Sequence, residues 1–170
     1  MKYYYSQYER PEIGKLYLLA DEEALVHMTY NPADFEKHAA ACHPAQMDEH
    51  QVFKELRIWL DGYFSGVNKE FTIPLRENGT EFQKQVWNRM KEIPYGETKS
   101  YSEIAYEINR PKAVRAIGQA SKANPYPILV PCHRVVGKKG QLTGYAGSKT
   151  DIKDRLLTLE NKNWATRQIN

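Results

Sequence analysis

The sequence predicts an α/β chain folded in two domains, a small amino-terminal α/β domain over residues 1–76 and a helical domain over residues 77–170. The first 30 residues mix aromatic and aliphatic side chains with short turn signals, a pattern typical of a small antiparallel sheet. Further along the chain, apolar residues recur at helical spacing instead. Phe71–Gly79 carries proline, asparagine and glycine, which marks the boundary. A chain of 170 residues can give each part a modest core of its own.

The strands of the amino-terminal part are predicted from apolar runs that the turn signals Ile13–Gly14 and Asp21–Glu23 interrupt. Between His50 and Phe64 the apolar residues change to helical spacing. They are Val52, Phe53, Leu56, Trp59, Leu60 and Phe64. This pattern predicts a helix that covers one face of the sheet and stops at Gly66.

The carboxy-terminal part opens on Thr80–Gln83, which has the pattern of a capping box and predicts the start of a helix. We expect the segment Pro94–Gly96 to end that helix, and two short helices to follow from about Ser102 and about Pro111. The residues expected on the buried side of the first helix are Phe82, Val86, Met90 and Ile93.

Two short helices joined by a tight turn can form a helix-turn-helix or an ordinary helical hairpin, and the spacing of the apolar residues fits both. The second helix favours the helix-turn-helix, because its small residues would let it lie close against another surface and Arg115 adds a positive charge. These small residues are Ala113, Ala116, Gly118 and Ala120.

The composition permits a nucleic-acid partner without requiring one, since 24 Lys and Arg residues against 21 Asp and Glu residues give a net charge of only +3. No apolar run approaches the roughly 18 residues of a membrane helix, and the polar start Met1–Ser6 lacks the apolar core of a signal peptide. We therefore expect a cytoplasmic protein with no membrane partner. Cys42 and Cys132 lie in unlike surroundings, so no disulfide is expected and a reducing compartment fits.

The segment Pro127–Arg134, with Asn124 just upstream, places Cys132 beside His133 among apolar residues. Burial in such a run would raise the pKa of the thiol, which would then be inert unless a neighbouring base took its proton. His133 is the candidate base. Adjacent side chains of an extended segment point to opposite faces, so we expect one water molecule to bridge the two. A purely structural cysteine is the alternative interpretation.

Four motifs closely resemble those of the O6-alkylguanine-DNA alkyltransferases, namely Pro111–Gly118, Asn124–Pro125, Pro131–Val135 and Thr143–Gly147. The resemblance implies a small α/β amino-terminal domain and a helical carboxy-terminal domain, whose winged-helix-like helix-turn-helix binds the DNA minor groove. It further implies a protein that flips O6-alkylguanine out of double-stranded DNA and transfers the alkyl group to its own cysteine. Each molecule would act once, as a monomer and without a cofactor, and O4-alkylthymine would be a second possible substrate.

By position, the resemblance implies that Cys132 accepts the alkyl group, that His133 activates the cysteine and that Glu160 orients the histidine. Tyr101 would protonate the guanine ring as it leaves. Asn124 would order the turn before a strand that carries the cysteine.

The same resemblance implies that Arg115 enters the duplex and fills the space that the flipped nucleotide leaves. The other residues expected to face the DNA are Tyr101, Ala113, Lys112, Lys122 and Arg134. Those expected to line the alkyl pocket are Val130, Pro131, Tyr145, Ala146, Gly147 and Ser148. Taken singly, each could be a packed or solvated side chain, and only their common spacing favours a site. After Gly147 many relatives continue with a second glycine and a leucine, whereas Ser148–Lys153 follows here. Because this loop lines the pocket, the range of alkyl groups stays open.

We expect no metal site. One cysteine and four histidines of the amino-terminal part could group in space, namely Cys42, His27, His38, His43 and His50. Their spacing fits no standard zinc motif, and they do not match the positions at which some relatives bind zinc. Solvated helix and loop residues are the expected interpretation.

Three other functions stay open at this point. An alkyltransferase-like protein that only senses alkylated bases would lack the cysteine, so Cys132 argues against it. A cysteine hydrolase using Cys132 and His133 would need an oxyanion hole and repeated turnover. A transcriptional regulator would need a further domain, for which 170 residues leave no room.

Overall fold

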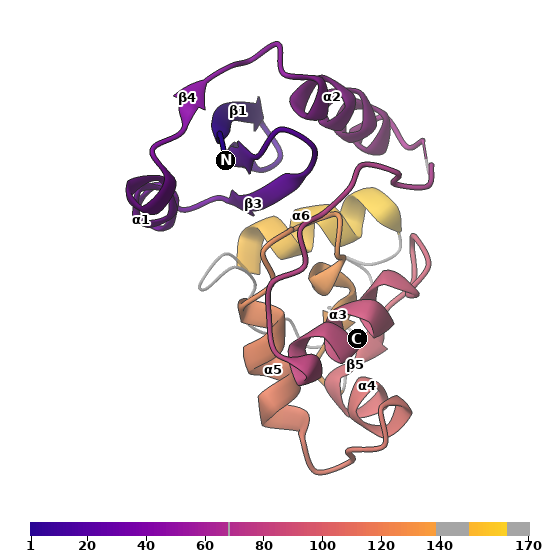
Figure 1. Cartoon of the computed structure of the whole chain (residues 1–170). Coiled ribbons are helices and arrows are strands. Elements are labelled where there is room, and N and C mark those ends of the chain that lie inside the picture. Colours follow the sequence, from indigo (N-terminus) through magenta and orange to yellow (C-terminus); the bar gives the residue numbers. More distant parts are fainter. Residues whose placement is uncertain (68, 139–149, 163–170) are drawn as a thin grey trace. The chain divides into compact units, whose positions relative to one another are not determined.

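The computed structural model describes residues 1–67, 69–138 and 150–162 (Figure 1). The chain folds into two compact units, Met1–Asn78 and Gly79–Asn170. The boundary predicted from the sequence lies two residues earlier, after residue 76. Along the described ranges, no helix combines the length and the apolar character that crossing a bilayer requires.

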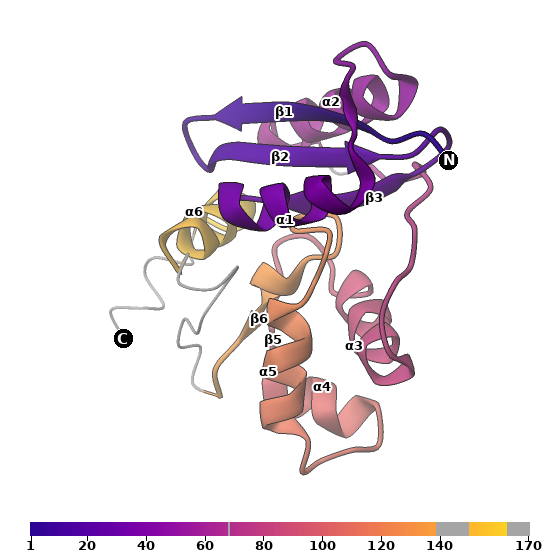
Figure 2. The ribbon, with the colours of Figure 1, turned by 60° about the vertical axis from the view of Figure 1, so that its left-hand side comes forward.

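A four-stranded sheet forms the centre of the first unit, in the order β3-β2-β1-β4. Its strands are β1 (Tyr4–Arg10), β2 (Gly14–Ala20), β3 (Leu25–Thr29) and β4 (Ala45–Gln46). The first three strands pair antiparallel (Figure 2). The short β4 adds to β1 in parallel. The antiparallel sheet predicted from the alternating pattern is confirmed, whereas the parallel edge strand β4 was not expected.

Two helices lie on opposite faces of this sheet, α1 (Pro32–Cys42) and α2 (Gln51–Phe64) (Figure 2). On one face, the ring of Tyr17 stacks on Phe35 of α1 at 5.3 Å between centroids. On the other face, the neighbouring position Tyr8 stacks on Phe64 of α2 at 6.4 Å. Residues 8 and 17 point to opposite faces, because residue 8 pairs with residue 16 across the ladder. The predicted helix is therefore present and begins at Gln51.

Helix α1 was not predicted, since only one of its residues, Phe35, is buried and the sequence shows no apolar stripe. Its ends explain why it forms. The side chain of Asn31 accepts a hydrogen bond from the Ala33 amide at 2.9 Å, and proline occupies the first helical position. At the other end His43 adopts a left-handed conformation with φ 48°, and its amide donates to the Ala39 carbonyl at 2.7 Å.

The segment after α2 returns to the sheet and closes the first unit. The Leu25 amide donates to the Pro74 carbonyl at 2.9 Å, and the Arg76 amide donates to the Leu25 carbonyl at 2.9 Å. The Arg76 guanidinium also forms an ion pair with Asp21 at 2.6 Å. These bonds keep residues up to Arg76 with the first unit.

The second unit is mainly helical. Over its described residues, 79–138 and 150–162, the helices are α3 (Glu81–Lys91), α4 (Tyr101–Glu107), α5 (Val114–Lys122) and α6 (Thr150–Glu160), with a 3₁₀ turn, η1 (Cys132–Arg134). Two short parallel strands accompany them, β5 (Lys99–Ser100) and β6 (Val135–Val136). The antiparallel sheet of the first unit and the helices of the second confirm the predicted fold class.

Helix α3 begins as predicted, because the Thr80 side chain and the Gln83 side chain each bond the other's backbone in a capping box. It ends at Lys91, before the predicted stop at Pro94–Gly96, so Ile93 is buried but lies beyond the helix. On its buried side, Trp87 donates a hydrogen bond to the Ala120 carbonyl of α5 at 2.8 Å. This bond ties α3 to α5.

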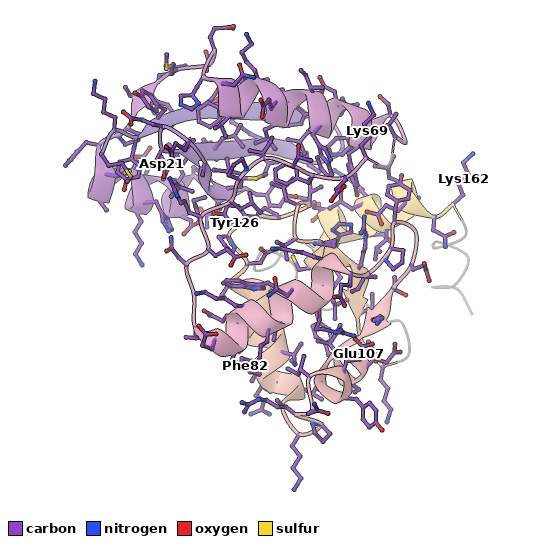
Figure 3. The ribbon with its side chains drawn as sticks, turned by 45° about the vertical axis from the view of Figure 1, so that its right-hand side comes forward. Asp21, Lys69, Phe82, Glu107, Tyr126 and Lys162 are labelled. Atoms are coloured by element: carbon purple, nitrogen blue, oxygen red, sulfur yellow. The ribbon has the colours of Figure 1, made fainter. Side chains whose placement is uncertain are left out.

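Helices α4 and α5 form the predicted pair of short helices. Ser100 caps α4 by accepting from the Glu103 amide at 3.0 Å, so the helix begins one residue before the predicted start. Helix α5 begins three residues after the predicted Pro111. Arg89 of α3 forms an ion pair with Glu107 of α4 at 2.8 Å, which links the first helix of the pair to α3. Glu107 is labelled in Figure 3.

Candidate active site around Cys132

Cys132 is 4% exposed and lies at the start of η1. Pro131 has φ −79° and ψ 64°, the values of an inverse γ-turn, and the Cys132 amide donates to the Val130 carbonyl at 2.7 Å. The Arg134 amide then donates to the Pro131 carbonyl at 2.9 Å and closes the 3₁₀ turn. The expectation of an extended strand at the cysteine is therefore wrong, because the proline bends the chain. Successive residues of a 3₁₀ helix still diverge by about 120°, so Cys132 and His133 point in different directions.

Asn124 lies against this turn and binds it through both ends of its amide. Its Nδ2 donates to the Val130 carbonyl at 2.9 Å and to Cys132 Sγ at 3.1 Å. Its Oδ1 accepts from the Tyr126 amide at 3.0 Å. Both kinds of contact fix the position of the sulfur.

The turn between Asn124 and Cys132 holds one residue in a costly conformation. Ile128 is buried and has φ 74°, a value that β-branched residues rarely adopt. Such a conformation costs on the order of 1–3 kcal/mol and persists where the surrounding contacts determine it. The Val130 amide, which donates to the Tyr126 carbonyl at 2.9 Å across Ile128, supplies one such contact.

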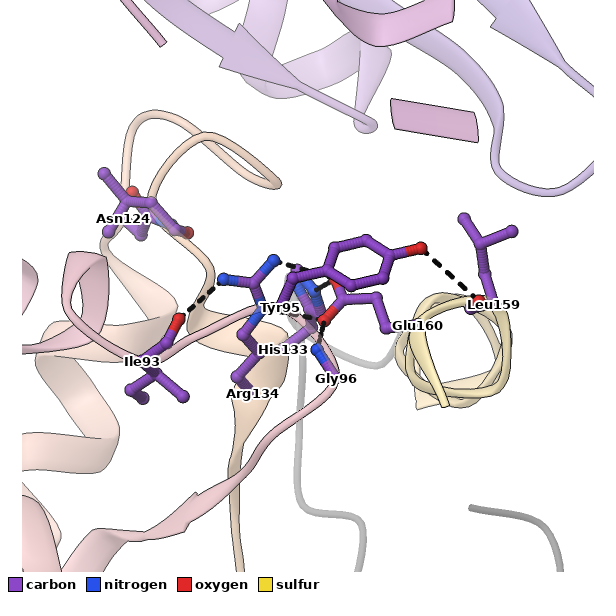
Figure 4. A network of polar contacts seen from close by, with 9 residues as sticks. Ile93, Tyr95, Gly96, Asn124, His133, Arg134, Leu159 and Glu160 are labelled. Carbon is purple, nitrogen blue, oxygen red and sulfur yellow. Dashed lines mark hydrogen bonds and ion pairs between the residues drawn. The ribbon is translucent and has the colours of Figure 1, made fainter. Parts of the chain in front are cut away.

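His133 is fully buried, and its Nε2 lies 2.6 Å from Glu160 Oε2 (Figure 4). Arg134 also contacts this carboxylate, with Nε 2.7 Å from Oε1 and Nη2 3.1 Å from Oε2. The remaining guanidinium nitrogen Nη1 donates to the Ile93 carbonyl at 2.7 Å. One buried carboxylate therefore serves both the imidazole and a buried cation. Nδ1 is the imidazole nitrogen that does not face Glu160.

The backbone around Gly96 supports the same carboxylate. The Gly96 amide lies 3.2 Å from Glu160 Oε1, and the Asn161 side chain donates to the Gly96 carbonyl at 3.2 Å. Gly96 has φ 84°, and a Cβ there would meet the Glu160 carbonyl oxygen at 3.2 Å. Both the backbone angle and the close approach favour glycine at this position.

The charges of this network follow from its burial. Burial alone would raise the pKa of Glu160, but the contacts with His133 and Arg134 outweigh it and hold that pKa well below its usual value. Burial lowers the pKa of His133, even though Glu160 opposes the shift. At neutral pH the carboxylate is thus ionised and the imidazole is neutral, so His133 can accept a proton.

Burial raises the pKa of the Cys132 thiol, as expected for a sulfur among apolar residues. Three neighbours favour the thiolate and reduce this shift, namely the amide of Asn124, the ammonium of Lys153 and the side chain of Ser121. The thiol is therefore protonated at rest, and the groups that would stabilise its anion are already in place.

Sequence reasoning missed Lys153, which is fully buried on α6. Its Nζ donates to the Val135 carbonyl at 2.5 Å and lies 3.4 Å from the Tyr101 hydroxyl. Burial lowers the pKa of Lys153 to about 8, although the Cys132 sulfur favours the charged form. A signal was present: Lys153 precedes Glu160 by seven residues, so both occupy the same face of a helix.

Tyr101 is the first residue of α4 and is partly buried. The Lys153 ammonium lies 5.6 Å from the centre of its ring as well as close to its hydroxyl. The charge of Lys153 therefore acts on both the Tyr101 hydroxyl and the Cys132 sulfur.

The residues expected to face DNA fall into two groups. Lys112, Arg115 and Lys122 are exposed on α5 or just before it, and Ala113 is partly buried at its start. Arg134 differs, since its guanidinium is committed to Glu160 and Ile93 inside the unit. The expectation that Arg134 lies on the phosphate side is corrected by this burial.

Of the residues expected to line the alkyl pocket, Val130 and Pro131 are buried in the turn before Cys132. The other four, Tyr145, Ala146, Gly147 and Ser148, lie outside the described residues.

In the first unit, the five residues considered for a metal cluster do not all meet. His50 caps α2 by accepting from the Val52 amide at 3.2 Å, and His43 ends α1. His27 and His38 do lie together, with their rings stacked at 3.8 Å. The residue that joins them is Asp34, which sequence reasoning did not consider.

Two family models match the chain. One, described as 6-O-methylguanine DNA methyltransferase, ribonuclease-like domain, matches residues 3–76. The other, described as 6-O-methylguanine DNA methyltransferase, DNA binding domain, matches residues 81–162. Together they cover both units.

Individual relatives agree with the family models. The constitutive methylated-DNA--protein-cysteine methyltransferase of Bacillus subtilis is 43% identical over 92% of this chain and 94% of its own. The crystal structure of Mycobacterium tuberculosis O6-methylguanine methyltransferase gives a TM-score of 0.79 at 39% identity, covering 94% of this chain and 93% of that chain. The Mycobacterium tuberculosis OGT in complex with DNA gives a TM-score of 0.75 at 34% identity, covering 98% and 94%. The chain belongs to the O6-alkylguanine-DNA alkyltransferase family.

Proposed function

We propose that this protein repairs DNA by transferring an alkyl group from the O6 atom of guanine to Cys132, once per molecule. The observation that carries the proposal is the buried Cys132 thiol, held at 3.1 Å by Asn124 and followed by a histidine that Glu160 orients at 2.6 Å. The name of the Bacillus subtilis relative, methylated-DNA--protein-cysteine methyltransferase, describes the same transfer for that protein.

The first step is activation of the sulfur. His133 takes the thiol proton at Nδ1 through a bridging water, since the two side chains point in different directions. Glu160, ionised and bonded to Nε2, stabilises the imidazolium that results and fixes the orientation of the ring. Lys153 favours the thiolate through its charge. A thiolate is the strong nucleophile that displacement at a saturated carbon requires.

In the second step Cys132 Sγ forms a bond to the alkyl carbon while the bond from that carbon to guanine O6 breaks. The electron pair of the broken bond passes to guanine, which takes up a proton as it leaves. Tyr101 donates this proton from its hydroxyl. The Lys153 ammonium, 3.4 Å from that hydroxyl, stabilises the phenolate that remains.

The product is a thioether on Cys132, and it ends the activity of the molecule. A carbon–sulfur bond to an alkyl group has no good leaving group, so the cysteine is not regenerated. Each protein molecule is therefore consumed by one lesion.

The DNA partner is bound through the helix-turn-helix of α4 and α5, with α5 in the minor groove. Flipping makes the O6 atom accessible to a buried sulfur. Arg115 fills the space left in the duplex, and Ala113 allows close approach at the start of the helix. Lys112 and Lys122 lie toward phosphates and add affinity that is independent of sequence. The protein acts as a monomer, and its free thiol fits the reducing cytoplasm.

The test is a titration of the full chain with a DNA duplex that carries one O6-methylguanine, followed by intact-mass and peptide analysis. We expect one methyl group in place of the thiol hydrogen on the Cys132 peptide, and never more than one equivalent. Cys132→Ser should show none, while Cys42→Ser, the matched control, should react as the native chain does. Continued turnover of excess substrate, or an unmodified Cys132, would refute the proposal.

A further inference from the structure

Three side chains of the first unit form a compact group that the proposed repair reaction does not use. His27 lies on β3, while Asp34 and His38 are one turn apart on α1. One ligand atom from each residue lies within 4.8 Å of the others. The group contains two imidazoles and one carboxylate, which together suit a divalent ion of intermediate softness such as Zn²⁺.

The distances within the group are close to those that such an ion needs. His27 Nε2 lies 2.8 Å from Asp34 Oδ2, and His38 Nδ1 lies 3.6 Å from Asp34 Oδ1. A tetrahedral zinc ion with bonds of about 2.0–2.2 Å holds its ligand atoms roughly 3.3–3.6 Å apart. The first separation is shorter than this range and the second lies at its upper end, so small side-chain movements suffice.

A simple tie between helix and sheet accounts for only part of this arrangement. The hydrogen bond between His27 and Asp34 would suffice to hold α1 on β3. Stacking of the His38 ring on His27, at 3.8 Å with an interplanar angle of 18°, places a second imidazole beside the same aspartate. His38 Nδ1 is bound to the Asp34 backbone carbonyl, and only a modest rotation separates it from a position shared with the other two donors.

We propose that His27, Asp34 and His38 bind one divalent cation of the Zn²⁺ class. The protein supplies three ligands, and the side chains of Asp34 and His38 are 37% and 41% exposed, so water completes the coordination. His38 Nδ1, which is 2.9 Å from the Asp34 carbonyl, turns toward the ion upon binding. The bound ion links β3 to α1 and stabilises the first unit.

The test measures zinc binding to the full chain after treatment with a chelator, by calorimetry and by NMR of the histidine side chains. Zn²⁺ should move the imidazole signals of His27 and His38 and raise the thermal midpoint, whereas Mg²⁺ should do neither. His38→Gln should weaken binding by more than the roughly 10- to 100-fold that follows loss of an outer-shell partner. His38 is half-exposed, so this variant should fold, and its metal-free thermal midpoint checks that it does.

Two controls separate this site from other zinc ligands. His43→Asn changes a nearby exposed histidine, and asparagine tolerates its left-handed backbone, so binding should be unchanged. A variant with serine at both Cys42 and Cys132 removes the free thiols, and it should still bind. Unmoved signals of His27 and His38, equal affinity in His38→Gln, or loss of binding in either control variant would each overturn the proposal.

Discussion

Arg134 and Glu160 form a buried two-point ion pair, with the guanidinium 2.7 Å from one carboxylate oxygen and 3.1 Å from the other. The second of these oxygens also faces His133 at 2.6 Å. The carboxylate therefore has two tasks, since it orients a neutral imidazole and balances a buried cation. Substitution of Glu160 disturbs both, and an experiment must separate them.

Glu160→Gln should slow methyl transfer without abolishing DNA binding, because the imidazolium formed at His133 loses its stabilising charge. The free energy of unfolding should also fall by roughly 3 kcal/mol or more, since Arg134 is left buried without its counter-ion. Single-turnover rates and urea unfolding measure the two effects at a temperature where the variant is folded.

A matched control for this variant is Asn161→Ala, which removes a hydrogen bond to Gly96 beside the same carboxylate and leaves Glu160 in place. It should cost about 1 kcal/mol of stability and little rate. If Glu160→Gln transferred methyl groups as fast as the native chain, the orienting role of Glu160 would be refuted.

Lys153→Met should slow transfer by roughly tenfold or more, because the thiolate of Cys132 and the phenolate of Tyr101 both lose a nearby positive charge. The rate should be measured with a free-base substrate as well as with duplex DNA. Equal rates in the native chain and the variant on both substrates would show that Lys153 is purely structural.

Lys153 also predicts how stability depends on pH. Its pKa is about 8 in the folded chain, against 10.5 for an ordinary lysine side chain. Between these values the unfolded chain binds more protons, so the free energy of unfolding should rise as the pH rises from 8 toward 10.5. The shift corresponds to about 3 kcal/mol at most. In Lys153→Met this part of the rise should disappear, whereas Lys138→Met, which changes an exposed lysine, should keep it. If the free energy of unfolding rose equally with pH in both variants, the prediction would be contradicted.

Much of the second unit follows from local sequence signals. The capping box at Thr80–Gln83 and the apolar periodicity after Ser100 placed α3, α4 and α5 to within three residues, whereas α6 was not predicted. Helix α1 could not be found in this way, because its only buried residue is Phe35 and its formation depends on the caps at its two ends. Apolar periodicity predicts helices that bury a stripe, and α1 does not.

In the site, the cysteine and the histidine were singled out from their own segment and the glutamate from a resemblance, but the geometry of all three depends on contacts between distant parts of the chain. Arg134 was expected at the surface, as most arginines are, and is buried because Glu160 lies 26 residues further on to receive it. Lys153 was overlooked because lysines, like arginines, usually lie at the surface. The γ-turn at Pro131 replaced the expected strand, since the proline and the Asn124 side chain together determine that backbone.

Arg115→Ala should weaken the repair of duplex DNA much more than the reaction with free O6-benzylguanine base. The side chain is exposed on α5 and takes no part in the proposed chemistry at Cys132. Its loss should therefore affect extrusion of the base and not the transfer of the alkyl group. Lys112→Ala is the control, and it should weaken duplex binding uniformly and reduce the salt dependence by about one phosphate contact. Equal losses on both substrates in Arg115→Ala would remove the assignment to base flipping.

Gly118→Ala tests whether α5 approaches DNA closely. A Cβ at Gly118 would meet nothing within 4 Å, so the fold itself does not require glycine there. Alanine is the better helix former by roughly 0.8–1.0 kcal/mol, and the variant should therefore be slightly more stable to urea. If α5 lies in the minor groove, the added methyl group should nevertheless weaken duplex binding and repair while leaving the free-base reaction unchanged. Higher stability with undiminished duplex repair would show that DNA does not approach this part of α5.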